Sequence, residues 1–424
     1  MNILHLLHDP LEELSKVLAR LGQQWTAVLG LPVALTVVLV YGLPRLARRA
    51  GAPQDARLLR EAGLLALGWG GVDLALTAGL PLLRLSYAPV RTAFFMLLWG
   101  RTGISGAGTA LALASVLAGR DLPPGGRRLI ARGLWTMHAA MALVLVYATY
   151  VGGARLRPTR ARLAFPGHTP GAPPLHLRLA QISDIHMERL SRRDEAMVAL
   201  LRETRPDLVL LTGDFINIDY YDVRAYEDLR ALLRAVVALN PPLGVYACLG
   251  NVDPPKLTGT LLESAGVHLL VDTAVTLPVD GRRVQILGAA TSRGHRWEYD
   301  LPHFQAAVAA AEAQGTPDFR LLLYHTPDFV PQAARAGVDL YLCGHTHGGQ
   351  IRLPLVGALR TGSRFGKRYV IGLNRLPNDG YIHTNRGLGF EGMSLPRIRT
   401  FCPPEVALFD VTIGACTGES GPAT

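Results

Sequence analysis

The sequence predicts an α/β domain of layered sheets and helices, preceded by an all-α transmembrane bundle. Two observations indicate this division. Residues 1–154 are dominated by Leu, Ala, Gly and Val, whereas the remainder mixes charged and apolar residues as soluble domains do. In the second part, short apolar runs alternate with amphipathic helical stretches, which is the pattern of an α/β layered fold. The mean hydropathy of +0.22 agrees with a membrane portion.

Residues 1–154 contain about four segments that we predict to be membrane helices, because a helix needs about 20 apolar residues to span the hydrocarbon layer. The segments are Trp25–Leu43, Ala62–Leu83, Thr102–Gly119 and Leu134–Ala154, of which the third is the weakest. Asp73 and Arg101 are costly in lipid, so we expect them to face the bundle interior. There they would form a pathway or lipid-headgroup site, or they would simply pair; alternatively, Arg101 extends from a helix end to the membrane surface.

The net charge of +10 comes almost entirely from arginine. Many arginines flank apolar segments, as in "RLARRAG", "GGRRLIARG" and "ARLRPTRAR". This placement favours contact with lipid headgroups over a nucleic-acid groove, which needs a basic stripe interleaved with aromatic residues. We therefore predict a multi-pass cell-membrane protein that contacts membrane lipids and no nucleic acid. The arginine-rich loops give conflicting indications of which membrane face carries the rest of the chain.

The rest of the chain divides into a linker, a domain and a tail. Residues 155–175 are rich in Pro, Gly and Arg and predict a linker, and residues 412–424 predict a flexible tail. Between them, residues 176–411 hold apolar runs such as "LRLAQIS", "DLVLLT", "RLLLYH" and "DLYLCG", each followed by a polar or glycine-rich loop. Because α/β folds bind ligands in the loops that follow their strands, we expect the site there.

Five of these loops carry side chains that commonly bind metals. A lone Asp or His after a strand is usually structural, but five successive loops of this kind are not explained by chance. Carboxylate, imidazole and carboxamide groups suit Mn, Fe or Zn, and seven of them suit two ions that share a bridging carboxylate. We predict two divalent ions, manganese first, with iron, zinc or magnesium as alternatives. The predicted ligands are Asp184, His186, Asp214, Asn251, His325, His345 and His347.

These loops resemble the signature of the calcineurin-like metallophosphoesterase superfamily, which consists of DxH, GD, GNH(D/E), H and GHxH. The corresponding stretches are "SDIHM", "TGDFIN", "GNVD", "LYH" and "CGHTHGG". "GHTHGGQIRLP", "NRGLG" and "FCPPEV" are similar to the membrane-associated bacterial branch and to metazoan transmembrane proteins with this domain. The resemblance covers about His176–Asp410 and implies a four-layer sandwich, in which two mixed sheets pack together between helices.

The resemblance also implies a role for each residue. One ion would be held by Asp184, His186 and His347. The second would be held by Asn251, His325 and His345, and Asp214 would bridge the two. A hydroxide between the ions would attack the phosphorus in line. The implied catalytic residues are Asp214, Asn251, Asp253 and His345, with Asp253 orienting its neighbours rather than binding metal.

One position departs from the family pattern, because Val252 stands where a histidine usually helps to protonate the leaving group. Such a general acid is typically worth about 10²–10⁴-fold in rate. An alkoxide leaving group needs this help, whereas a phosphate, with a second pKa of about 6, does not. The sequence therefore favours a phosphodiester or pyrophosphate substrate, or an acid supplied elsewhere, and the membrane portion suggests a lipid-linked substrate.

The stretch "TSRGHRWEYDLPHF" contains a basic group formed by Arg293, His295 and Arg296. These residues would bind a substrate phosphate or replace the missing acid. The alternative is an exposed basic loop without a role in catalysis.

Two other functions stay open from the sequence. A phosphomonoesterase or protein phosphatase would use His295 or a water molecule in place of the missing histidine. Alternatively, the membrane portion is a sensor or transporter, and the metallophosphoesterase-like domain only regulates it. The complete ligand set speaks against an inactive domain, because loss of activity commonly removes ligands first.

Overall fold

The computed structural model describes residues 26–87, 90–118, 120, 122–217, 223–292, 296–391 and 397–414. The chain divides into two compact units. The first is Met1–Tyr147 with Gly392–Arg397, and the second is Ala148–Glu391 with Ile398–Thr424. This division at Tyr147 falls slightly before the boundary predicted at residue 154.

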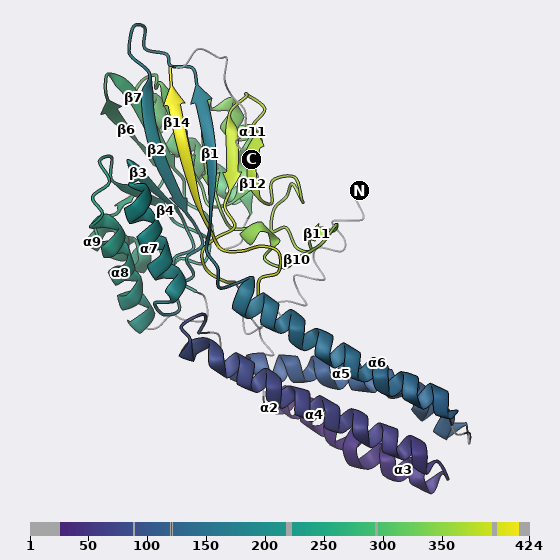
Figure 1. Cartoon of the computed structure of the whole chain (residues 1–424). Coiled ribbons are helices and arrows are strands. Elements are labelled where there is room, and N and C mark those ends of the chain that lie inside the picture. The colour runs from purple at the N-terminus through teal and green to yellow at the C-terminus, as the bar shows by residue number, and fades with distance from the viewer. Residues whose placement is uncertain are drawn as a thin grey trace. The chain divides into compact units, whose positions relative to one another are not determined.

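The first unit is a set of helices (Figure 1). Prolines stand in the first turns of three of them, where a missing N–H is tolerated because that N–H has no partner within the helix. The helical elements are α2 (Thr26–Val37), the π-helical η1 (Val38–Gly42), α3 (Leu43–Arg49), α4 (Pro53–Leu82), α5 (Val90–Leu117) and α6 (Pro124–Val146). A second π-helical turn, η2 (Tyr147–Val151), follows α6.

Among the described residues, three helices are long and apolar enough to cross a membrane: Leu31–Arg49, Pro53–Leu82 and Pro124–Val151. They correspond to the first, second and fourth predicted segments. The third predicted segment lies in α5, which is 28 residues long and begins at Val90, before the charged Arg101. The described residues therefore contain a helical segment at each of the four predicted positions, and three of these segments are long and apolar enough to cross a membrane.

Asp73 and Arg101 form a fully buried pair inside the first unit. Arg101 Nε and Nη2 donate to the two Asp73 carboxylate oxygens at 2.8 and 2.7 Å. Arg101 Nη1 donates to the His138 carbonyl, and the guanidinium lies over the Trp69 ring. The simpler sequence-based interpretation, a pair facing the bundle interior, is thus what the structure contains.

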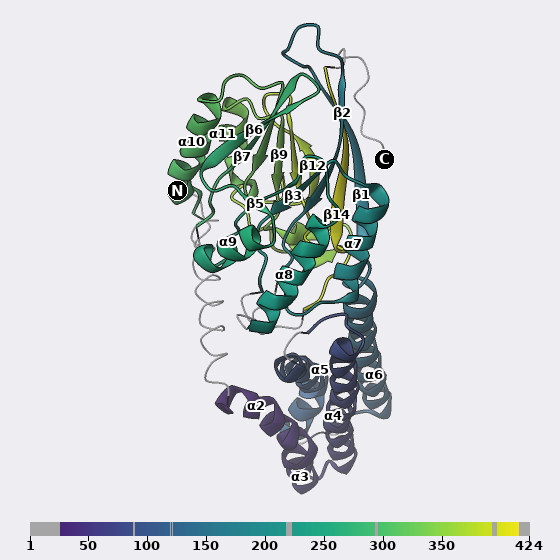
Figure 2. The same ribbon diagram turned by 90° about the vertical axis from the view of Figure 1, so that its left-hand side faces the viewer.

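The second unit contains two six-stranded mixed sheets and a short two-stranded sheet (Figures 1 and 2). The first sheet has the order β1-β14-β2-β3-β4-β5, and the second has the order β12-β13-β9-β8-β7-β6. The strands of the first are β1 (Arg157–Phe165), β14 (Glu405–Ile413), β2 (Leu175–Ile182), β3 (Leu208–Thr212), β4 (Val245–Cys248) and β5 (His268–Leu269). Those of the second are β12 (Gly372–Arg375), β13 (Tyr381–Thr384), β9 (Leu340–Cys343), β8 (Phe319–Leu323), β7 (Arg282–Gly288) and β6 (Thr273–Val279).

The two large sheets pack face to face between two layers of helices. Alternate residues along one strand enter different cores: Leu208 and Leu210 of β3 join the cluster between the sheets, whereas Val209 and Leu211 join the cluster under helices. The helices on the first sheet are α7 (Arg192–Thr204), α8 (Val223–Val237) and α9 (Pro255–Ser264). Those on the second sheet are α10 (Trp297–Glu312) and α11 (Val330–Arg335). This is the four-layer fold that was predicted.

The structure differs from the sequence-based boundaries at both ends of the domain. The predicted linker, residues 155–175, contains β1, which pairs with β14 in parallel register from Arg157↔Glu405 to Phe165↔Ile413. β14 in turn runs past the predicted end of the domain at residue 411. β1 was not predicted, because it is an edge strand whose first residues are arginine-rich and whose partner among the described strands, β14, lies far along the chain.

Candidate metal centre

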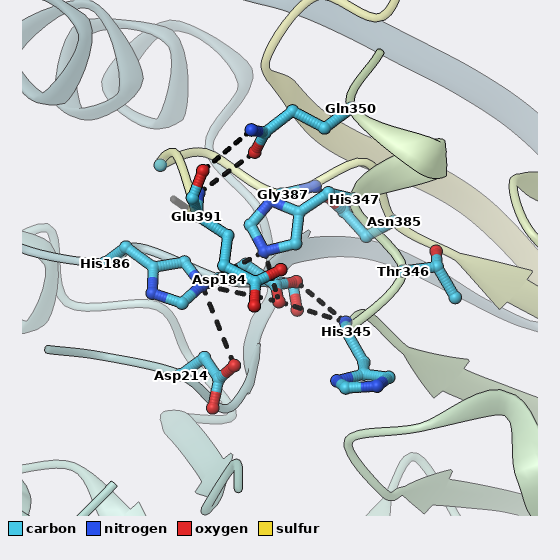
Figure 3. A network of polar contacts seen from close by, with 12 residues as sticks. Asp184, His186, Asp214, His345, Thr346, His347, Gln350, Asn385, Gly387 and Glu391 are labelled. Atoms are coloured by element: carbon cyan, nitrogen blue, oxygen red, sulfur yellow. Dashed lines mark hydrogen bonds and ion pairs between the residues drawn. The ribbon is translucent and has the colours of Figure 1, made fainter. Parts of the chain in front are cut away.

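The candidate ligands lie in loops that follow β2, β3, β4, β8 and β9. β2, β3 and β4 are parallel neighbours in one sheet, and β8 and β9 are parallel neighbours in the other. Their carboxyl ends therefore lie on common edges, and the loops that follow them meet. Figure 3 shows Asp184, His186, Asp214 and His347 directed toward one another from these loops.

Two groups of three side chains offer donor atoms that all lie within 4.8 Å of one another. The first is Asp184, His186 and His347, in which the two imidazole Nε2 atoms are 3.0 Å apart. Asp184 Oδ1 lies 3.3 Å from His347 Nε2. All three residues are buried, so their charges are poorly screened by water.

The second group is Asp214, His325 and His345. Asp214 Oδ2 lies 3.1 Å from His325 Nε2 and 3.7 Å from His186 Nε2 of the first group. In the same way, Asp184 Oδ1 lies 4.0 Å from His325 Nε2. The two groups are thus adjacent, and Asp214 lies within 3.7 Å of an imidazole of each group.

The backbone holds these side chains in an uncommon conformation. A positive φ, from 42° to 67°, occurs at Asp184, His186, Asp214, His345 and His347. Non-glycine residues rarely adopt this region, and such residues concentrate at functional sites because the surrounding structure must hold them there. Five of the seven predicted ligands share this property, which supports one functional centre rather than scattered structural residues.

Asp253 fixes the loop that carries Asp214. Its carboxylate accepts main-chain hydrogen bonds from Gly250 at 2.8 Å, Asp214 at 2.9 Å and Phe215 at 2.8 Å. Because both oxygens are used in this way, Asp253 holds the backbone of these loops together. The Val252 N–H donates to Asp214 Oδ1 at 3.1 Å, which leaves Asp214 Oδ2 facing the histidines.

Glycines allow the loops to come this close. A Cβ on Gly344 would lie 1.9 Å from Ser183 Oγ and 2.1 Å from Asp184 Oδ2. A Cβ on Gly250 would lie 2.1 Å from Asp214 Oδ1. Any side chain at either position would displace a candidate ligand.

The donor atoms fit divalent cations. His325 Nδ1 lies 2.7 Å from the Thr212 carbonyl and must donate to it, so in the neutral ring Nε2 carries the lone pair. That Nε2 is buried and lies 3.1 Å from Asp214 Oδ2, to which an unprotonated nitrogen cannot donate. Asn251 Oδ1 is also buried and has no hydrogen-bond partner among the described residues. Lone pairs that converge on carboxylates repel one another unless a proton or a cation lies among them. Buried nitrogen and oxygen lone pairs that no hydrogen-bond donor satisfies are typical of a metal-binding site, so these residues fit divalent cations.

The pKa values of the metal-free centre reflect the same crowding. Burial raises the pKa of Asp184 to about 7, with a further increase from Asp214. Burial also acts to raise the pKa of Asp214, but His325, His186 and His345 outweigh it and lower that pKa. Burial opposes the charge on His325, yet Asp214 and Asp184 raise its pKa to about 10. Protons therefore occupy this centre when cations do not, and cation binding must release them.

Three further residues beside the centre were missed from the sequence. Arg399, which is fully buried, places Nη2 3.2 Å from His347 Nδ1 and also donates to the Gly387 and Gly389 carbonyls. When His347 Nδ1 carries a proton and cannot accept a hydrogen bond, Arg399 Nη2 can therefore still donate to these two carbonyls. Gln350 and Glu391 join two loops through a reciprocal side-chain to main-chain pair at 2.7 and 3.0 Å (Figure 3). The motif "GHTHGGQIRLP" contains Gln350, "NRGLG" ends two residues before Glu391, and "FCPPEV" begins two residues after Arg399, which was the available signal.

The predicted substrate-binding group is only partly described. Arg293 and His295 lie outside the described residues. Arg296 is exposed at the N-cap of α10, with its guanidinium over the Tyr299 ring. No hydrogen bond or ion pair joins Arg296 to the candidate ligands in the part of the chain that the structure describes.

Two mixed sheets between helices, with Asp and His side chains gathered at the strand ends, define a metallophosphoesterase. Residues 177–349 match the family model described as calcineurin-like phosphoesterase. Phosphodiesterase YaeI of Escherichia coli (strain K12) is 34% identical over 240 residues, which are 54% of this chain and 80% of that protein. The chain belongs to the calcineurin-like phosphoesterase family and is accordingly a metal-dependent phosphoric ester hydrolase.

Two other relatives extend this comparison. The uncharacterized metallophosphoesterase YkuE of Bacillus subtilis (strain 168) is 28% identical over 243 residues, or 55% of this chain and 78% of that protein. UDP-2,3-diacylglucosamine pyrophosphatase LpxG of Chlamydia muridarum (strain MoPn / Nigg) is 25% identical over 325 residues, or 64% of this chain and 93% of that protein. The family thus includes proteins named for diester and for pyrophosphate hydrolysis.

Proposed function

We propose that this protein is a membrane-embedded, dinuclear metallophosphoesterase that cleaves phosphodiester or pyrophosphate bonds, with lipid-linked substrates as the class to test first. The observation that carries the proposal is the pair of adjacent donor groups on either side of Asp214. Asp184, His186 and His347 would hold one ion, and Asn251, His325 and His345 the other. Bound divalent ions would activate a water molecule and neutralise charge on the phosphoryl group.

The chain's own residues prepare this centre. The Thr212 carbonyl holds His325 in the tautomer that presents Nε2, and Asp253 holds the Asp214 loop through three hydrogen bonds. Asp184 accepts the His345 N–H at 3.0 and 3.1 Å, which joins the loop after β2 to the loop after β9. These contacts fix the donors before any ligand arrives, so that little reorganisation is needed.

Val252 bears on the kind of bond that is cleaved. Its aliphatic side chain has no proton to give, so an alkoxide leaving group, whether of a monoester or of a dialkyl diester, receives no help from this position. The leaving group of a pyrophosphate is a phosphate or a phosphomonoester, which leaves without such help because its conjugate acid is much stronger, and an aryl diester likewise has a good leaving group. The name of the relative LpxG supports the pyrophosphate, and the name of YaeI supports the diester.

The membrane part of the proposal rests on the three apolar helices and on their length. We propose a multi-pass protein of the cell membrane, held there by the first unit. A tethered catalytic domain meets lipid-borne substrates at a high effective concentration, which favours this substrate class.

The proposal is tested by measuring the hydrolysis of bis-p-nitrophenyl phosphate, a pyrophosphate and an alkyl phosphomonoester by the manganese-loaded full chain. We expect turnover of the first two and little of the third, and no turnover by Asp214→Asn. Val252→His should raise kcat/KM for the alkyl monoester by up to about 10²-fold, with a much smaller effect on p-nitrophenyl phosphate, whose leaving group needs no acid. A wild-type preference for alkyl monoesters would instead indicate a phosphomonoesterase.

A further inference from the structure

A short hairpin rises directly from the loop that carries His347. It consists of β10 (Arg352–Leu353) and β11 (Gly357–Ala358), which pair in antiparallel register and form a sheet of their own (Figure 1). Its tip bears Leu355, which is fully exposed at 108%, and Val356; Leu353 and Leu359 beside it are also exposed. Four large aliphatic side chains in seven residues therefore face away from every hydrophobic core in the second unit.

Cations surround this apolar tip. The sequence from His347 to Asn378 contains no aspartate or glutamate. The exposed cations that follow the hairpin are Arg360, Arg364, Lys367 and Arg368. Two carboxylates interact electrostatically with this group: Glu391 with Arg360, and the buried Asp328 with Arg364, whose N–H it also accepts. The surface is thus apolar at its tip and positive around it.

The hairpin is held in place rather than loosely attached. Lys367 Nζ donates to the Val356 carbonyl at 2.8 Å, and Arg352 Nη1 donates to the Gly348 carbonyl at 2.8 Å. The Arg352 main chain also pairs with Thr400, through its N–H to the Thr400 carbonyl at 3.0 Å. An exposed apolar tip that the fold supports in this way indicates a surface for an apolar partner.

We propose that this surface, residues 352–368, docks on an anionic lipid bilayer, with the aliphatic tip inserted between headgroups and the cations on lipid phosphates. Apolar side chains next to Lys and Arg are the composition of interfacial membrane anchors. The cations attract an anionic leaflet, and the membrane helices of the same chain keep lipid within reach. A partner protein would have to complement the same positive rim, whereas a lipid leaflet does so without a specific fold.

This surface is continuous with the candidate metal centre. Only four residues separate His347 from Arg352 in the sequence. In addition, a Cβ on Gly362, in the loop after β11, would lie 3.5 Å from His345 Nε2. On the proposed function, docking brings headgroups to the edge of the centre. The substrate class is then a phosphodiester or pyrophosphate carried by a membrane lipid.

The test places a spin label on the full chain in proteoliposomes. The label is attached at Leu355→Cys; Cys248, Cys343 and Cys402 are buried, and Cys416 is changed to serine. A matched label at Arg202→Cys reports the last turn of α7, which lies at the end of the sheet away from the centre because α7 connects the parallel strands β2 and β3. The rate at which each label collides with oxygen, which concentrates in lipid, is compared with the rate at which it collides with a water-soluble nickel complex.

We expect the label at position 355 to become accessible to oxygen and protected from nickel in bilayers containing phosphatidylglycerol, and the label at position 202 to stay accessible to nickel. Arg364→Gln with Arg368→Gln should reduce the docked-to-undocked ratio about 25-fold, or about fivefold for each cation removed. Arg234→Gln, on the last turn of α8, should leave it unchanged.

A label at position 355 that stays open to nickel in every bilayer overturns the proposal. Self-association would instead be indicated by protection that does not depend on anionic lipid and that rises with the protein-to-lipid ratio, together with disulfides between two copies of the unlabelled Leu355→Cys protein; this outcome also overturns the proposal. Because neither readout involves hydrolysis, failure here leaves the hydrolase proposal standing, and an inactive enzyme leaves this one standing.

Discussion

Asp253→Asn should separate the positioning of the metal centre from its chemistry. The Asp253 carboxylate accepts three main-chain hydrogen bonds, two on Oδ2 and one on Oδ1. An asparagine amide keeps only one accepting oxygen, so it can satisfy the Gly250 and Asp214 N–H groups but turns its own N–H₂ toward the Phe215 N–H. A buried N–H left without an acceptor costs about 1–3 kcal/mol of folding free energy.

The second effect of Asp253→Asn is on metal affinity. Replacing a residue that orients a metal ligand typically weakens binding about 10–100-fold. We expect a weaker manganese affinity by calorimetric titration of the full chain in detergent, and activity that returns at high manganese concentration. Recovery by excess metal distinguishes a displaced Asp214 from a lost catalytic group, since Asp214→Asn should not recover.

Asp318→Asn is the matched control, because Asp318 is also buried and also accepts three main-chain hydrogen bonds, from His168, Thr169 and Arg283. It precedes β8, whereas His325 follows that strand, so it lies at the opposite end of the sheet. Both variants should lose stability, Asp318→Asn the more because Asp318 also pairs with the buried Arg282 at 3.2 Å, and only Asp253→Asn should lose metal affinity. Equal manganese affinity in the two variants would refute the positioning argument.

Three further outcomes are expected. Burial acts to raise the pKa of Asp318, but hydrogen bonds from Thr169, Arg283 and His168 lower it to about 2. The ionised Asp318 should therefore contribute about 2 kcal/mol to the free energy of unfolding above about pH 4, and this contribution should disappear as the pH falls toward 2. The free energies of unfolding of wild type and Asp318→Asn, measured by denaturant titration, should therefore become similar in acid. Arg101→Leu should destabilise the bundle by about 3–5 kcal/mol, because it leaves Asp73 buried without its partner, and adding Asp73→Leu should restore most of the loss in detergent-unfolding curves. Gly344→Ala should abolish manganese-induced stabilisation, because its Cβ would displace Asp184; a manganese-dependent rise in Tm like that of wild type would contradict this.

The sequence was sufficient for the parts of the fold and site that are encoded locally. Apolar runs followed by polar loops predicted the strands, and the parallel arrangement of β2, β3 and β4 then accounts for the convergence of Asp184, Asp214 and Asn251. The residues were recognisable because each stands directly after a buried strand.

The features that were missed depend on contacts between distant segments. Arg399 approaches His347 only because the loop before β14 folds back across the centre, and nothing beside it in the chain indicates this. β1 was interpreted as part of a linker for the same reason, since its pairing partner is β14. A single arginine or an edge strand gains its role from where the rest of the chain arrives, which periodicity along the sequence does not report.

The position of β14 has a consequence for biosynthesis. Thr159 of β1 donates to Glu405 of β14, 246 residues later, and β14 also separates β1 from β2. During translation, the helices of the first unit are made early, but the first sheet keeps an unfilled gap until the last strand leaves the ribosome. Closing so long a loop is slow, and unpaired strand edges attract other chains in the meantime. Nascent chains that stop before residue 405 should therefore depend on chaperones and be prone to aggregation.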